Sequence, residues 1–112
     1  MRKICILWKT GNRIDIETMV LPYIRNSKVK DWWDEVEVII WGDSQQTIAN
    51  EPEYQKAISK LSNEGITFFA CKSCADKLCV TELLQGLQVD VQYTGKLLSD
   101  RLQDASVEVL TL

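Results

Sequence analysis

The chain of 112 residues contains no histidine. Catalytic triads, cysteine–histidine pairs and metal sites with imidazole ligands therefore cannot be built within one copy of the chain. Histidine is also the side chain whose ordinary pKa lies closest to neutrality. Proton transfer near pH 7 would require a perturbed carboxylate, thiol or lysine instead.

Long apolar runs and clustered charges are also missing. No stretch approaches the ~18 apolar residues of a membrane-spanning helix. The opening residues, MRKICILW, resemble a signal peptide only superficially, because the apolar run stops at Lys9 and no small-residue cleavage site follows. They predict a buried first strand. Since no export signal is recognised, we expect a cytoplasmic protein. The formal net charge is −3 and basic residues are scattered, so we expect it to bind neither nucleic acid nor membrane.

The chain has only two prolines and five glycines, and no linker or low-complexity segment divides it. Its length is that of one domain. Hydrophobic residues make up 46% and charged residues 26%, enough for one core and a soluble surface. A single domain over residues 1–112 is therefore predicted.

Strand-like and helix-like segments alternate along the sequence. Short apolar runs predict five strands, at residues 4–8, 36–41, 66–71, 89–93 and 107–110. Apolar residues at helical spacing predict helices at about 16–24, 44–50, 50–65, 75–87 and 97–103, the first kinked or shortened by Pro22 and the third capped by Asn50. Repeated strand–helix–strand units favour a mainly parallel sheet with helices on both faces, so the predicted fold class is α/β.

In such sheets, ligands and reactive groups gather beyond the carboxyl ends of the strands. The turns expected there are Thr10-Gly11-Asn12, Gly42-Asp43-Ser44, Cys71-Lys72-Ser73-Cys74 and Thr94-Gly95-Lys96. The sequence contains neither a G-x-G-x-x-G run nor a P-loop, so no nucleotide or other cofactor is predicted. An ordinary turn and helix cap is the favoured role of Thr10, Gly11 and Asn12, with an anion cradle as the alternative.

The segment CKSCADKLC places Cys71 at the end of the third predicted strand and Cys74 near the first turn of the next helix. Backbone N–H groups and the helix dipole favour a thiolate there, and Lys72 adds a positive charge. A thiolate attacks sulfane sulfur or a disulfide, and the three-residue spacing lets two thiols approach each other. The alternative is that one or both thiols simply pack in the interior.

The other two cysteines are predicted to be core residues. Cys5 lies within the first strand, and Cys79 lies on an apolar helical stripe with Leu78 and Leu83. A closed zinc site needs four ligands, and only Cys71 and Cys74 have ligand spacing, so no metal is predicted. In a reducing cytoplasm all four cysteines are expected to be thiols.

Two adjacent tryptophans, Trp32 and Trp33, precede the second strand. Two neighbouring indoles do not both fit comfortably into one small core. Either one of them covers a subunit contact, or Trp33 packs under the sheet while Trp32 lies half exposed. Both interpretations are open at the level of the sequence.

The segments ILWKTG, WWDEVEVIIWGDS and ITFFACKSCAD, followed by VTELLQGLQVDVQYTG, resemble the DsrE-like family of sulfur-relay proteins over nearly the whole chain. The resemblance implies a three-layer α/β/α domain with a mainly parallel five-stranded sheet. It also implies a small homo-oligomer, commonly a trimer or hexamer. Relay members carry a persulfide on a cysteine at the end of the third strand, a position that matches Cys71, and many have a second cysteine that matches Cys74.

The leading hypothesis is therefore a small sulfur carrier without cofactor. The Cys71 thiolate accepts sulfane sulfur from a donor protein as a persulfide and passes it to an acceptor thiol, with Lys72 and Ser73 in supporting positions. Cys74 either resolves the persulfide or modulates the pKa of Cys71. The alternatives are a thiol–disulfide oxidoreductase or redox sensor that uses both cysteines, and a non-catalytic oligomeric binding module with inert cysteines.

Overall fold

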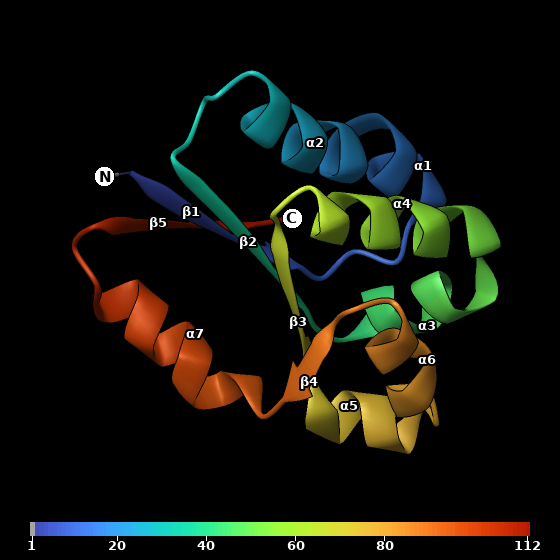
Figure 1. Cartoon of the computed structure of the whole chain (residues 1–112). Helices are drawn as coiled ribbons and strands as arrows, with labels where there is room; N and C mark the ends of the chain where they lie inside the picture. Colours follow the sequence, from blue (N-terminus) through green and yellow to red (C-terminus); the bar gives the residue numbers. More distant parts are fainter. Residues whose placement is uncertain (1) are drawn as a thin grey trace.

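Five parallel strands form one sheet in the order β4-β3-β2-β1-β5 (Figure 1). The structure, a computed structural model, describes residues 2–112. The strands are β1 (Lys3–Trp8), β2 (Glu35–Ile40), β3 (Thr67–Cys71), β4 (Asp90–Gln92) and β5 (Val107–Thr111). All four neighbouring pairs are parallel, so the predicted five-stranded sheet is confirmed.

Helices cover both faces of the sheet. They are α1 (Arg13–Asp15), the π-helical η1 (Ile16–Val20), α2 (Leu21–Val29), α3 (Asp43–Asn50), α4 (Pro52–Asn63), α5 (Lys72–Lys77), α6 (Thr81–Gly86) and α7 (Thr94–Gln103). Helix α7 lies on the side of the sheet opposite α1, α2 and α4 (Figure 1). The predicted three-layer α/β/α architecture is therefore confirmed. Within residues 2–112, no helix is both long and apolar enough to cross a membrane.

The main core lies between the sheet and the larger helical layer. Side chains alternate between the two faces of a strand, and Ile4, Ile6 and Trp8 of β1 point to this face with at most 2% of their surface exposed. They pack in one cluster with residues of β2, β3 and the helices: Val36, Val38, Ile40, Phe68, Ala70, Ile16, Val20, Ile24, Ile48, Ile58 and Leu61. Continuous apolar strands of this kind are typical of a parallel sheet that is covered on both faces.

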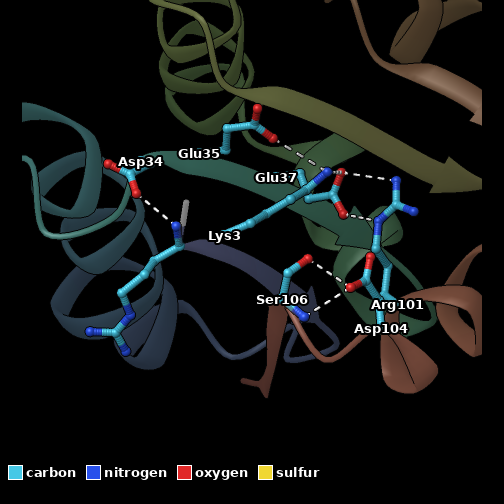
Figure 2. Close-up of polar contacts among 8 residues, drawn as sticks. Lys3, Asp34, Glu35, Glu37, Arg101, Asp104 and Ser106 are labelled. Atoms are coloured by element: carbon cyan, nitrogen blue, oxygen red, sulfur yellow. Dashed lines mark hydrogen bonds and ion pairs between the residues drawn. The ribbon is translucent and has the colours of Figure 1, made fainter.

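The opposite face carries a cluster of charges around one buried carboxylate (Figure 2). Glu37, in the middle of β2, is only 3% exposed. Its carboxylate binds the Arg101 guanidinium of α7 and lies 3.2 Å from the Lys3 ammonium of β1. Because these groups come from α7 and two adjacent strands, the ion pairs fasten α7 to the sheet.

Cys5 lies in the core, as predicted, with none of its surface exposed. Burial, together with the neighbouring Glu37 carboxylate, raises the pKa of its thiol to about 12. A thiol with this pKa stays protonated at neutral pH, and the protonated form is a poor nucleophile. Cys5 is therefore a packing residue.

The predicted single helix over residues 75–87 is wrong, and so is the prediction that Cys79 is a core residue. The chain leaves the helical path at Cys79, which has a φ of 58° and is exposed. The Cys79 N–H donates to the Asp76 carbonyl and the Val80 N–H donates to the Ala75 carbonyl, which is the Schellman pattern that ends a helix. Val80 turns inward in place of Cys79.

Other boundaries differ by smaller amounts. Pro22 does not shorten the first helix, because the helical path runs without a break from Arg13 to Val29. The proline follows a π-helical turn over Ile16–Val20, a local change in the hydrogen-bond pattern beside the residue that lacks an N–H. The N-cap of α4 is Glu51 and not Asn50. Trp33 packs against the core while Trp32 is 50% exposed, as in the second arrangement considered for this pair. That Trp32 covers a subunit contact stays a prediction.

Candidate thiol site

Two buried side chains at the start of α3 join the carboxyl ends of three strands. The Ser44 hydroxyl lies 2.8 Å from the Trp8 carbonyl oxygen, at the end of β1. The Gln45 amide donates to the carbonyl oxygens of Ile40 at 3.1 Å and Cys71 at 3.2 Å, at the ends of β2 and β3. Both side chains are fully buried. They hold the backbone of Cys71 at a fixed place on this rim.

Cys71 is the last residue of β3 and the N-cap residue of α5, with an extended backbone. Only 5% of its surface is exposed. Cys71 is in register with Gln92 of β4, and α7 begins at Thr94, two residues after Gln92. The thiol therefore lies where α5 and α7 both start.

Opposing effects act on the ionisation of Cys71. Burial raises the pKa of the thiol, since it disfavours the charged form. The N–H groups of Cys74 and Ser73, the Thr94 hydroxyl and the Cys74 thiol lower it by stabilising the thiolate, and together they prevail. The pKa of Cys71 is therefore below that of an ordinary thiol, which increases the fraction of the nucleophilic form at neutral pH.

Cys74, the second cysteine of the pair, is half-buried in the first turn of α5. Both its N–H group and its thiol act on Cys71. The structure thus brings together the two cysteines that the sequence singled out. All four cysteines of the chain are free thiols.

Lys72 and Ser73 contribute differently from what the sequence suggested. The Lys72 ammonium forms an ion pair with Asp76 at 2.6 Å and lies 5.9 Å from the centre of the Tyr93 ring. Its charge is thus compensated on α5, and the groups that lower the pKa of Cys71 are N–H, hydroxyl and thiol donors. Ser73 has an exposed side chain and acts through its backbone N–H.

Thr94 is the site residue that sequence reasoning missed. Its side chain is fully buried, and its hydroxyl has no hydrogen-bond partner among residues 2–112. The expected rim included the turn Thr94-Gly95-Lys96, but nothing in the local sequence linked this turn to Cys71. The proximity of Thr94 to Cys71 depends on tertiary structure, because the pairing of β4 with β3 brings the start of α7 beside the end of β3.

The remaining rim residues have structural roles. The Asn12 side chain accepts a hydrogen bond from the Asp15 N–H at 3.1 Å and caps α1, and the Thr10 hydroxyl accepts one from the Asn12 N–H at 3.1 Å. These bonds form the turn and cap that were the favoured interpretation. At Gly11, a Cβ atom would meet the side chains of Asp43 and Thr47, so any other residue would require these side chains of α3 to shift.

Gly42 also has a structural role. Its φ of 74°, which glycine adopts readily, lets the chain turn between β2 and α3. The turn after β1 lies two strands from β3 in the sheet, a separation of about 10 Å at the usual strand spacing.

A groove between α2 and α4, lined in part by Leu21, Tyr54 and Leu61, does not include Cys71. No group of three or more Cys, Asp or Glu residues within residues 2–112 is arranged to hold a metal ion.

The chain is similar to three solved proteins, two of which are of unknown function. A conserved protein of unknown function from Bacteroides thetaiotaomicron, BT1422, is 32% identical, with a TM-score of 0.92 over 98% of this chain and 94% of that one. MTH1491 from Methanobacterium thermoautotrophicum and the ychN protein from E. coli are 19% and 16% identical over the full length of both chains, with TM-scores of 0.76 and 0.66. The latter two share the fold. The sequence matches no family model and no curated protein.

Proposed function

We propose that this chain, which belongs to the same family as the Bacteroides thetaiotaomicron protein BT1422, is a DsrE-like sulfur-relay protein of the cytoplasm. Cys71 accepts sulfane sulfur as a persulfide and passes it to another thiol. The observation that carries this proposal is the environment of Cys71, a recessed cysteine at the junction of β3 with α5 whose pKa is lowered by the neighbouring N–H, hydroxyl and thiol groups.

The proposed relay consists of two exchange steps. The Cys71 thiolate attacks the outer sulfur of a donor persulfide, R–S–SH, which forms Cys71–S–SH and releases the donor thiolate RS⁻. An acceptor thiolate then attacks the outer sulfur of Cys71–S–SH, which forms the acceptor persulfide and releases the Cys71 thiolate. No net oxidation occurs, so no cofactor is required. A thiol with a lowered pKa favours the second step, because it is the better leaving group.

A thiol–disulfide oxidoreductase is the second candidate function, and the contact between Cys74 and Cys71 favours it. In the relay, the Cys74 thiol stabilises the Cys71 thiolate. In the alternative, the Cys74 thiolate attacks Cys71 within a mixed disulfide or persulfide, which yields a Cys71–Cys74 disulfide and releases the other sulfur as a thiolate or as HS⁻.

The mass of the intact protein after treatment with a persulfide donor tests the proposal. We expect a gain of one sulfur atom, located on the peptide that contains Cys71, and loss of that sulfur when an acceptor thiol is added. Loss of two hydrogens, with Cys71 and Cys74 joined, would instead support the redox function. An unchanged mass, with thiols that react only after unfolding, would support an inert binding module.

The second part of the proposal is a homo-oligomer, a trimer or hexamer, that exchanges sulfur with donor and acceptor proteins. Helix α7 alone covers one face of the sheet (Figure 1), and Tyr93 and Leu102 near its two ends are 68% and 64% exposed. Strands β4 and β5 leave two open sheet edges. Light scattering at micromolar concentration should give three or six times the 12.8 kDa mass of one chain; a monomeric mass would contradict the proposed assembly.

A further inference from the structure

The Thr94 hydroxyl is a buried polar group without an ordinary partner. It is fully buried and has no hydrogen-bond partner in the part of the chain that the structure describes. Leaving a buried hydroxyl unpaired is costly, by about 1–3 kcal/mol, so such a group in a native structure calls for an explanation.

The fold brings the start of α7, and with it this hydroxyl, beside the end of β3 where Cys71 lies. Strand β4 is the neighbour of β3, with Gln92 in register with Cys71, and Thr94 begins α7 two residues later. Figure 1 shows α5 and α7 leaving the sheet from the same ends of these two strands. A neutral thiol is a weak hydrogen-bond acceptor, whereas an ionised acceptor forms the stronger bond. The hydroxyl therefore gains its full partner only when Cys71 is ionised.

We infer that Thr94 is a catalytic residue, whose hydroxyl donates a hydrogen bond to the Cys71 sulfur as negative charge develops there. The inference rests on the proposed relay and assigns Thr94 to its second step. When the acceptor thiolate attacks the outer sulfur of Cys71–S–SH, the S–S bond breaks and its electron pair moves to the Cys71 sulfur. Thr94 stabilises that pair and transfers no proton. The N–H groups of Ser73 and Cys74 act on the same atom.

The substitution Thr94→Val tests this role, because valine keeps the branched shape and removes only the hydroxyl. Thr94→Ser keeps the hydroxyl and is the matched control. From preloaded Cys71, sulfur transfer to a small thiol should be about tenfold slower in Thr94→Val, which corresponds to about 1.4 kcal/mol in the barrier. Thr94→Ser should remain close to the unsubstituted protein.

A second measurement separates a direct effect on the sulfur from general damage. In Thr94→Val, the pH midpoint of Cys71 alkylation should move upward. At alkaline pH, where Cys71 is fully ionised, alkylation should be as fast as in the unsubstituted protein or faster, because a more basic thiolate is the stronger nucleophile. Misfolding would not slow the release of sulfur from the Cys71 persulfide while leaving the alkylation of the Cys71 thiolate undiminished.

The possible failures are distinguishable. If the unsubstituted protein takes up no sulfur, the proposed relay is wrong, and an upward shift in the alkylation midpoint would still establish the contact between Thr94 and the thiolate. If folded Thr94→Val has an unchanged midpoint, or releases sulfur at the normal rate, the catalytic role of Thr94 is wrong. Thermal unfolding at neutral pH checks that both variants fold.

Discussion

Replacing Cys71 with serine is expected to abolish both the rapid phase of alkylation at pH 7 and all capture of sulfane sulfur, while the circular dichroism spectrum stays native. The serine hydroxyl has nearly the size of the thiol but does not ionise near neutrality, so the N–H groups of Ser73 and Cys74 have no anion to stabilise. Iodoacetamide time courses with peptide mapping by mass spectrometry would measure the loss.

The other cysteines supply the controls for this experiment. Cys79 is exposed, so the experiment is best done in a Cys79→Ala background, where an ordinary surface thiol does not contribute. Cys5 is fully buried, and its pKa is raised to about 12, so Cys5→Ser should leave the rapid phase intact. A rapid phase that persisted in Cys71→Ser would identify Cys74 as the nucleophile.

Replacing Arg101 with methionine is expected to lower the free energy of unfolding by about 3 kcal/mol. The change leaves the Glu37 carboxylate, which is 3% exposed, with Lys3 as its remaining charged partner (Figure 2). Removing one member of a fully buried ion pair costs about 3–5 kcal/mol. The expected loss lies at the lower end of this range, because Arg101 is partly exposed and Lys3 still lies beside Glu37. Urea unfolding followed by circular dichroism measures the loss.

The same helix offers a matched control. Lys96 and Asp100 of α7 form an ion pair at 3.0 Å, but the Lys96 side chain is 86% exposed. Exposed pairs contribute about 0–1 kcal/mol, so Lys96→Met should change stability little. The double substitution Arg101→Met with Glu37→Leu should recover much of the loss, since no unpaired charge then remains. Equal effects of Arg101→Met and Lys96→Met would show that the charges around Glu37 do not fasten α7.

The fold class was predictable because each strand is a short apolar run and each helix has its own periodicity. The runs that contain Ile4, Val38 and Phe68 are buried in the sheet, as expected. The prediction failed at Cys79, where a Schellman turn uses a cysteine at the position that glycine usually occupies. Without the glycine, the residues on either side of the break read as one continuous helix.

The candidate site was predictable only in part. The position of Cys71 follows from local sequence, since it ends a strand and precedes a helix. Thr94 and Gln45 could not be placed beside it, because their contacts with Cys71 depend on strand pairing and on a side chain that crosses from α3. The pairing of Lys72 with Asp76 was within reach of the sequence, since a spacing of four residues on a helix brings opposite charges together.

The position of β1 inside the sheet has a consequence for how the chain folds. One neighbour of β1 is β2, but the other is β5, and the register pairs Lys3 with Val107. Closing a contact between the two extremes of the described chain is entropically expensive, and folds with such non-local pairings form slowly. While a ribosome is still making β5, β1 remains an unpaired edge. The nascent chain therefore passes through an aggregation-prone stage that ends only when the last strand docks.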